Sequence, residues 1–273
     1  MGKVKKRVLI GLSILFFVLT LSFLLTPTIG NWIHQEKLKS TIETYSNVVS
    51  SLSDQEKESY LEEAKEYNVN LTNSIINDYS IAYDDILNFN GNGQIGTVSI
   101  PKINVNLPIF HGVNDDVLSE GAGHMPETSF PIGGESTHSV ISAHTAFPNK
   151  EFFDDLPKLE EGDTFYIGVL GDTLVYEVKN IVVVDPDDAS PLEIERGKDL
   201  VSLLTCYPYA VNTHRIIVTG ERIKMNDTNT PVEVIDKKDI SVNPLVTTVI
   251  FVGVATLIVI TSIICKKIVK KRK

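Results

Sequence analysis

The stretch LVSLLTCYPYAVNTHRIIVTGERI, residues 200–223, contains two runs rich in aliphatic and β-branched residues, joined by a polar loop. Such runs predict two β-strands, near Leu200–Cys206 and Arg215–Ile223. If the strands pair as an antiparallel hairpin, Cys206 and Arg215 stand at the same end of the sheet on neighbouring strands. A thiol then lies beside a permanent positive charge, which favours the thiolate and can hold an anionic transition state.

The same β-rich pattern begins at Gln94 and continues upstream of this hairpin, as short runs separated by Gly, Pro and Asp. Seven or eight strands in about 130 residues indicate a closed or nearly closed barrel. We therefore expect a mostly β fold, with a closed eight-stranded barrel over residues 91–223. Its remaining strands are predicted near Ile95–Ile100, Val105–Phe110, Ala122–Met125, Ser139–Ala143, Thr164–Leu170 and Thr173–Val184.

The segments between these strands carry weaker signals. Short helices are expected at Asp115–Ser119 and Lys150–Leu156. The pair Gly171-Asp172 suits a tight two-residue hairpin turn. The loop over residues 185–199, DPDDASPLEIERGKD, is too long for a simple hairpin and is expected to form the wall of a cleft.

Two uncharged apolar runs flank the polar part of the chain, Val8–Thr26 and Pro244–Cys265. At about 1.5 Å per residue they reach roughly 28 and 33 Å, close to the ~30 Å hydrocarbon thickness of a bilayer, so both are predicted to be membrane helices. Basic tails at residues 1–7 and 266–273 place both termini in the cytoplasm and the rest outside. The first run is longer than a signal-peptide core and no clear cleavage site follows it, so an uncleaved anchor is expected.

Two further segments connect the predicted membrane helices to the barrel. Residues 27–90 lack β patterning and are expected to be helical and extracellular. One helix is predicted near Trp32–Val49, and a second opens at a capping box formed by Ser53 and Glu56. Residues 224–243 have little apolar periodicity and are expected to be a linker.

The charge is unevenly distributed. Ten of the 25 basic residues lie in the two cytoplasmic tails, so the remaining 15 face all 35 acidic residues and the outer portion carries a net charge of −20. Such a surface repels nucleic acid and excludes that class of partner. The acids Asp185, Asp187 and Asp188 lack the alternating spacing of an EF-hand loop and are interpreted as solvated.

Cys206 has no intrachain partner outside the membrane, because the second cysteine, Cys265, lies at the inner end of the second predicted membrane helix. In an oxidising outer compartment a lone cysteine is a buried small hydrophobe, an intermolecular linker or a reactive thiol. The residues that lie near Cys206 in the fold must show which of these three roles it has.

A thiol nucleophile also needs a group that accepts and returns a proton, and six histidines compete for this role. His144 ends a predicted strand and opens a loop, a position suited to a cleft. His214 directly precedes Arg215 and in a strand would point the opposite way from it. Spacing favours His144 without deciding the choice. The other four are interpreted as surface residues, His34 and His111, or as structural strand residues, His124 and His138.

The combination of these segments resembles a known family. SLLTCYPYAVNTHRIIVTGERI resembles the signature of sortases, the cysteine transpeptidases of Gram-positive cell surfaces: Thr-Leu-x-Thr-Cys, then a loop and an arginine-bearing strand. PIGGESTHSVISAHTAFPNKEFFDDLPKLEEGDTFYI resembles the family's histidine segment, and GQIGTVSIPKINVNLPIFHGVNDDVLSEGAGHMPETSFPIGG its first strands. The likeness runs from about residue 91 to residue 223. Two membrane helices and the Asn-Thr-His-Arg ending point to class C, the pilin-polymerising branch.

The resemblance implies a sortase-type barrel whose functional residues are His144, Cys206 and Arg215. Cys206 would attack the threonine carbonyl of an LPxTG-like sorting signal, and His144 would protonate the departing glycine amine. A lysine of a pilin subunit would then resolve the thioester. Arg215 would stabilise the oxyanion or hold the peptide, and Thr205 could contribute to the oxyanion site. No metal or organic cofactor is implied, and a monomer is expected.

The sequence departs from the family pattern in two places. Ser202 replaces the first threonine of the motif. Residues 31–90 lack the Asp-Pro-aromatic lid of many class C members, with Asp78-Tyr79 as a weak substitute. Three alternatives therefore stay open: anchoring of surface proteins to the cell wall, a Cys–His peptidase that hydrolyses its acyl-enzyme, and a non-enzymatic scaffold or sensor that spans the membrane twice.

Overall fold

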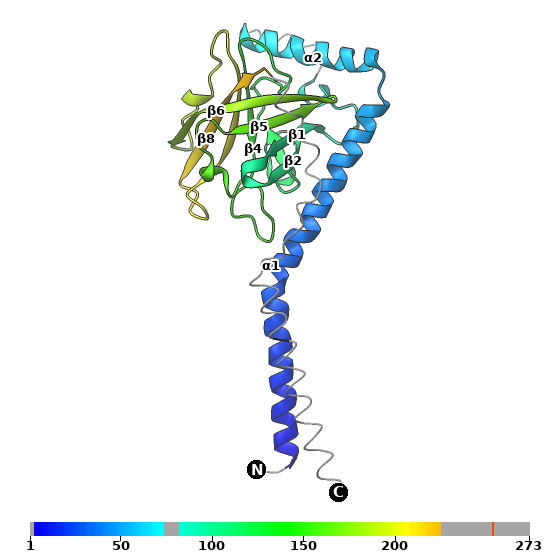
Figure 1. Ribbon diagram of the computed structural model, residues 1–273, viewed down its shortest axis with the longest axis vertical. Coiled ribbons are helices and arrows are strands. Elements are labelled where there is room, and N and C mark those ends of the chain that lie inside the picture. The colour runs from blue at the N-terminus through cyan, green and yellow to red at the C-terminus, as the bar shows by residue number, and fades with distance from the viewer. Residues whose placement is uncertain (1–2, 74–81, 225–252, 254–273) are drawn as a thin grey trace. The chain divides into compact units, whose positions relative to one another are not determined.

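Eight strands close into a barrel, as the sequence predicts, and their order around it is β1-β2-β3-β4-β7-β8-β6-β5. Figure 1 shows these strands gathered beside the helices α1 (Lys3–Ser51) and α2 (Asp54–Thr72). The computed structural model describes residues 3–73, 82–224 and 253 of the chain. The observed strands agree with the predicted ones to within two residues at every end. They are β1 (Gln94–Ile100), β2 (Val105–His111), β3 (Ala122–His124), β4 (Thr137–Ser142), β5 (Thr164–Val169), β6 (Asp172–Val184), β7 (Asp199–Tyr207) and β8 (His214–Ile223).

Two neighbouring pairs in this barrel are parallel, β2 with β3 and β4 with β7, and the other pairs are antiparallel. The β4–β7 pair matters for function because it joins strands that are far apart in the chain. Its register runs from Thr137 opposite Asp199 to Ser142 opposite Leu204. The end of β4 therefore lies beside the end of β7.

Successive side chains of a strand point to opposite faces of the sheet, and the buried residues of β7 follow this rule. Val201 and Leu203 belong to the main core inside the barrel. Leu204 belongs to a separate small cluster with Val140 of β4 and Ile217 of β8. We call these last three residues the outer cluster, since they lie on the outer face of the sheet.

The first helix is longer than predicted. α1 (Lys3–Ser51) continues without interruption from the apolar run Val8–Thr26 through the helix expected at Trp32–Val49. The two segments predicted separately are therefore one helix. A proline at position 27 removes one backbone hydrogen bond and a glycine at position 30 weakens helix propensity, but neither ends this helix.

Both N-terminal helices pack against the barrel (Figure 1). The Tyr45 hydroxyl of α1 donates to the Ile95 carbonyl at 3.0 Å and accepts from the Leu170 N–H at 3.1 Å. α2 (Asp54–Thr72) begins at the predicted capping box, in which Ser53 accepts from the Glu56 N–H. Its Asn68 side chain pairs in both directions with the Phe130 backbone, at 3.0 and 2.7 Å.

The connections differ from prediction at two points. Residues 150–155 contain no helix, and only Leu156 of the expected range is helical, as the first residue of η3. The Asp154 carboxylate accepts from the N–H groups of Ala146 and Phe152, both at 2.8 Å, and folds the segment into an irregular loop. The hairpin turn lies one residue earlier than expected, with positive φ at Leu170 and Gly171. The remaining short helices are η1 (Tyr83–Asp85), η2 (Pro101–Ile103), α3 (Asp115–Leu118), η3 (Leu156–Lys158) and η4 (Ser190–Leu192).

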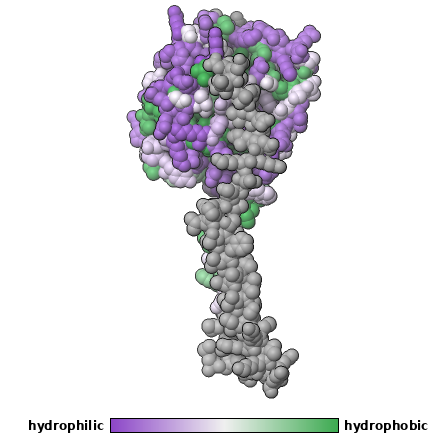
Figure 2. All heavy atoms as spheres, in the orientation of Figure 1, coloured by the Kyte–Doolittle hydropathy of each residue, from purple (hydrophilic) through white to green (hydrophobic). Residues whose placement is uncertain are grey.

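Among the described residues, one helix is long and apolar enough to cross a membrane, the stretch Gly11–Ser51 of α1 near the N-terminus. The predicted second span, Pro244–Cys265, lies outside the described residues except for Gly253, as does the expected linker after Lys224. Over the barrel, the face visible in Figure 2 is mainly hydrophilic, in keeping with its many acidic residues.

Four of the six histidines are buried. For His124 and His138 this agrees with the structural role expected of them. For His34 and His111 the surface position expected from the sequence is wrong. Both ring nitrogens of His111 lie near backbone carbonyls, those of Gly93 at 3.1 Å and Ile86 at 2.8 Å. His34 is only 5 % exposed, beneath the loop that follows β4.

His124 gives the fold a specific pH dependence. Its Nε2 donates to the Ser129 carbonyl at 2.9 Å and its Nδ1 accepts from the Tyr83 hydroxyl at 2.8 Å, which suits the neutral ring. Burial lowers the pKa of His124 from 6.5 to about 4. Between these pH values the unfolded chain binds a proton at His124 that the folded chain does not bind. The contribution of His124 to the free energy of unfolding is therefore fully present above pH 6.5 and decreases towards pH 4.

We therefore expect the free energy of unfolding to be lower at pH 5 than at pH 7 by about 2 kcal/mol through His124 alone. Urea unfolding at the two pH values measures it. His124→Gln should reduce the measured difference by about this amount, whatever its effect at pH 7, while the contribution of His34, whose pKa burial also lowers to about 4, remains. His214→Gln, a change of an exposed histidine, should keep the wild-type difference. Equal pH dependence in wild type and His124→Gln would contradict the assignment.

Candidate active site

Cys206 and Arg215 face each other across the β7–β8 hairpin. They are direct Cα partners in the antiparallel register, and opposite residues of an antiparallel pair project to the same face. Cys206 is an unpaired, half-buried cysteine, and Arg215 is also half-buried. The loop between them begins with the cis peptide Tyr207-Pro208 and exposes Tyr209 and Val211. The predicted pairing of these two residues across the hairpin is thus present.

His144 reaches the same place through the parallel β4–β7 pair. The ladder continues one residue beyond Ser142, because the Ala143 N–H donates to the Leu204 carbonyl at 3.2 Å. His144 is the next residue in the chain. It therefore follows the ladder at the level of Cys206.

Thr205 closes this end of the pair. Its hydroxyl donates to the Ala143 carbonyl at 2.7 Å, and its side chain is 1 % exposed. Thr205, which precedes Cys206, is thereby hydrogen-bonded to Ala143, which precedes His144. The hydroxyl proton is engaged on the core side of the sheet, so the possible contribution of the Thr205 side chain to an oxyanion site is not supported by this geometry.

The alternation of side chains directs two of the candidate groups to the outer face. Ile216 lies in the main core, so Arg215, its neighbour in β8, points outward, as Cys206 does. His144 lies two residues beyond the end of β4, at the same end of the β4–β7 pair as Cys206.

Aromatic rings surround the imidazole of His144. Its ring centroid lies 5.1 Å from that of Phe147 and 6.5 Å from that of Phe152. The His144 carbonyl accepts from the Phe153 N–H at 3.0 Å. Burial lowers the pKa of His144, and the negative charge of Asp115 in α3 opposes this shift. The imidazole is therefore mainly neutral at pH 7 and able to accept a proton.

One nitrogen of Arg215 is held by the loop that precedes it. Its Nη1 donates to the carbonyls of His214 at 3.0 Å and Asn212 at 3.4 Å. A guanidinium carries five N–H donors. The remaining donors can serve a carbonyl oxygen or an oxyanion that approaches Cys206.

The loop between β6 and β7 covers part of the outer face, as its length suggests. Leu192 packs on the outer cluster, and the Glu193 carbonyl accepts from His138 Nδ1 at 2.8 Å. Ser202, which replaces the first threonine of the family motif, has a structural role. Its hydroxyl lies 2.8 Å from both His138 Nε2 and Thr219 Oγ1. A small hydroxyl residue thus bridges β4, β7 and β8 there.

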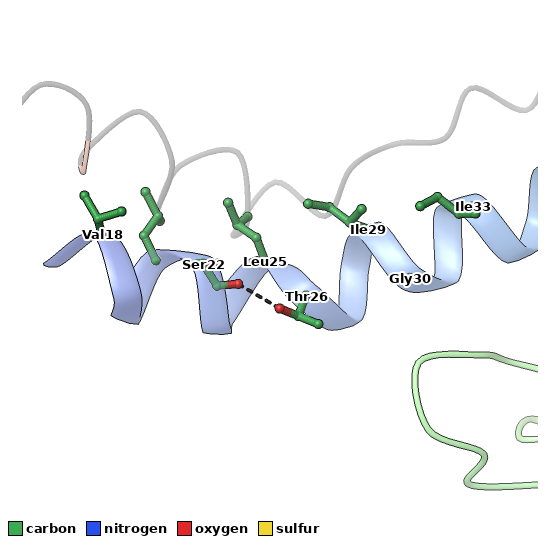
Figure 3. Close-up of a pocket in the computed structure, with 8 residues that line it drawn as sticks. Val18, Ser22, Leu25, Thr26, Ile29, Gly30 and Ile33 are labelled. Atoms are coloured by element: carbon green, nitrogen blue, oxygen red, sulfur yellow. Dashed lines mark hydrogen bonds between the residues drawn. The ribbon is translucent and has the colours of Figure 1, made fainter. Parts of the chain in front are cut away.

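No group of three or more His, Cys, Asp or Glu residues suited to a metal ion occurs in the described part of the chain. A hollow along α1, lined by Val18, Leu25, Ile29 and their neighbours, is apolar and contains no titratable side chain (Figure 3). It is not suited to acyl-transfer chemistry. The alternative lid residues Asp78 and Tyr79 lie outside the described residues.

Three contributors to the site could not be found from sequence motifs. Asp115 acts on His144 through its charge, from a helix that the sequence does place but does not connect to the site. Asp154 shapes the loop after His144 through backbone contacts. His34 of α1 packs against Phe152, with ring centroids 5.0 Å apart.

Comparison with known proteins identifies the fold. The family model of the sortase domain matches residues 98–223. The crystal structure of Clostridium perfringens sortase C with the C-terminal cell wall sorting motif is 40 % identical, with a TM-score of 0.62 over 68 % of this chain and 99 % of that one. This chain belongs to the sortase family.

Other sortases are also similar to this chain. Sortase C1 of Streptococcus agalactiae is 38 % identical, with a TM-score of 0.66 over 68 % of this chain and 100 % of that chain. Sortase D of Bacillus subtilis is 32 % identical over 131 residues, which are 47 % of this chain and 63 % of that protein. The match thus spans less than two thirds of this curated relative. The structural neighbours named here are sortases of class C.

In this sortase barrel, Thr205→Val should lower the free energy of unfolding by about 1–3 kcal/mol, because the buried Ala143 carbonyl loses its donor. Thr205→Ser keeps a donor and should lose less. Urea unfolding compares the two variants. A valine variant as stable as wild type would show that the bond does not hold β4 and β7 together.

The pKa of His144 should lie below 6.5, and Asp115→Asn should lower it further because the stabilising negative charge is removed. Titration of the imidazole by NMR measures both values. Asp116→Asn removes the adjacent charge of α3, which is not among the groups acting on His144, and should leave the pKa unchanged. An equal response to both changes would refute a specific role of Asp115.

Proposed function

We propose that this chain is a membrane-anchored cysteine transpeptidase that cleaves an LPxTG-like sorting signal through a thioester and transfers it to an amine. The observation that carries the proposal is the meeting of Cys206, Arg215 and the end of β4 at one point of the outer face. The likeness to a class C sortase solved with a cell wall sorting motif supports a substrate of this kind. The acceptor we infer is a lysine of a pilin subunit.

The first half-reaction forms the thioester. The Cys206 thiol passes its proton to the neutral imidazole of His144, and the sulfur attacks the threonine carbonyl of the sorting signal. Negative charge develops on the carbonyl oxygen, where the free donors of Arg215 can stabilise it. As the C–N bond breaks, His144 returns the proton to the departing glycine amine.

The second half-reaction reverses the order of these events. The incoming amine attacks the thioester carbonyl, gives a proton to His144, and Cys206 leaves as a sulfur that regains that proton. An amide bond is broken and another amide bond is formed. The exchange therefore needs no ATP.

The surroundings of the three groups suit a peptide of this type. The partly buried residues that pack on the outer cluster offer an apolar surface to a leucine side chain; they are Met125, Val182, Val184 and Leu192. The exposed side chains Tyr209 and Val211 border the same end of β7 and β8. The acidic outer portion attracts a positively charged lysine-bearing acceptor.

The proposed topology has both termini in the cytoplasm and the barrel outside. The apolar part of α1 supports the first crossing. The second crossing, Pro244–Cys265, rests on its length and on the basic residues that follow it. The barrel would then work on substrates held at the same membrane.

The test supplies the full chain in detergent with a labelled LPxTG-type peptide and a lysine-bearing amine. We expect an isopeptide product and a trapped thioester with wild type, and neither with Cys206→Ala, because one small side chain replaces another and only the nucleophile is lost. His144→Ala and Arg215→Ala should reduce turnover by about 10²-fold or more. Mass spectrometry measures the isopeptide product and the enzyme-bound thioester for all four proteins.

His214→Ala is the matched control, since it removes an exposed side chain next to Arg215 while keeping the backbone carbonyl that Arg215 uses. It should turn over like wild type. Free acid instead of the amine adduct would identify a hydrolase, and preference for a cell-wall peptide amine would identify an anchoring enzyme. An inert Cys206 in wild type would support the scaffold alternative.

A further inference from the structure

The segment of α1 that follows the predicted membrane run touches the loop that begins at His144. A Cβ atom on Gly30 would lie 2.8 Å from the Cβ of Asn149, closer than real Cβ contacts allow. One residue later, the Asn31 side-chain oxygen accepts from the Glu151 N–H at 3.2 Å. Helix and loop are therefore in direct contact, and glycine is needed at the closest point.

His34 extends this contact by one helical turn. It is 5 % exposed and meets Phe152 edge to face, with ring centroids 5.0 Å apart. Burial, with the positive charge of Lys150, lowers the pKa of His34 to about 4. The ring is neutral at pH 7, which suits packing against an aromatic residue. Lys37 adds an ion pair to Glu120, at the edge of the same contact.

The aromatic contacts continue to the imidazole of His144. Phe152 packs at right angles on Phe147, with ring centroids 5.8 Å apart. Both rings lie against His144, Phe147 at 5.1 Å and Phe152 at 6.5 Å. A displacement of the loop at Asn149 or Phe152 therefore reaches the ring of His144.

The loop has a second support that does not involve α1. The Asp154 carboxylate holds the N–H groups of Ala146 and Phe152. These bonds define the backbone course of the loop, but they do not contact the ring of His144. The orientation of that ring depends on Phe147 and Phe152, and α1 covers Phe152 through His34.

We propose that Gly30, Asn31 and His34 of α1 are positioning residues for His144, so that the membrane helix is part of the catalytic apparatus. The proposal rests on the proposed function, in which His144 transfers the proton. α1 holds Phe152 and Asn149 in place, these fix the aromatic pair, and the pair orients the imidazole towards Cys206. The three α1 residues do not touch the substrate.

The decisive variant is Gly30→Ala in the full chain, assayed in detergent. Alanine is a better helix former than glycine, so α1 itself is not weakened. The added methyl group should push Asn149 and its loop away, and kcat should fall about tenfold while KM changes less than about twofold. Gly11→Ala is the matched control, because a Cβ there meets nothing within 4 Å in the same helix; it should behave as wild type.

A second change should rescue the first. Asn149 has a positive φ of 60°, a conformation that glycine adopts readily. Asn149→Gly removes the Cβ with which the methyl group added at position 30 collides. The double variant Gly30→Ala/Asn149→Gly should therefore regain kcat close to that of Asn149→Gly alone. Unchanged kcat in Gly30→Ala, or a loss that Asn149→Gly does not relieve, would overturn the proposal.

His34 is tested in parallel. His34→Phe keeps an aromatic ring against Phe152 and should retain most of kcat. His34→Ala removes the ring and should lower kcat by about as much as Gly30→Ala does. Equal activity of the two variants would contradict a role of the ring contact.

A readout without substrate separates this proposal from the proposed function. The NMR chemical shifts of the His144 imidazole are compared between these variants of the full chain at one pH. They should change in Gly30→Ala and His34→Ala, and not in Gly11→Ala, because the rings of Phe147 and Phe152 no longer hold the imidazole in place. If wild type transfers no peptide but the shifts still change, the transpeptidase assignment fails and the positioning role stands. If peptide is transferred and no shift changes, the positioning role fails.

Discussion

The hydrogen bond from the Thr205 hydroxyl to the Ala143 carbonyl is the contact on which the site depends. It lies at the end of a parallel strand pair, where the ladder would otherwise open, and it is buried in the core. A neutral hydrogen bond contributes little net energy, but a buried carbonyl without a donor is costly. The two strand ends therefore stay together, and the thiol and imidazole that follow them stay together as well.

The β7–β8 hairpin was predictable because it is local in sequence. Alternation and turn residues set the two strands, and the pairing of Cys206 with Arg215 follows from a short loop between them. The placement of His144 was not predictable from spacing, because it depends on a parallel pairing between distant strands. The family resemblance pointed to His144 where periodicity could not.

The errors also have physical causes. His34 and His111 stand in sequence that carries no local sign of burial, and only tertiary packing buries them. The helix expected at residues 150–156 has helix-compatible composition, but Asp154 captures the backbone donors that a helix would use. The sequence places the helices at Val8–Thr26 and Trp32–Val49 as separate elements. The observed helix joins them, and Gly30 between them serves a close approach to Asn149.

The parallel β4–β7 pair has a consequence for how the chain matures. Arg215 reaches Cys206 by closing a short local loop, an event with a small entropic cost. The imidazole arrives only when strands about sixty positions apart have joined, since Thr205 and Ala143 are separated by 62 residues. Contacts of such high order form slowly. In a nascent or partly folded polypeptide the sulfhydryl thus lacks the base that we propose for it, and only the finished domain brings the two residues together.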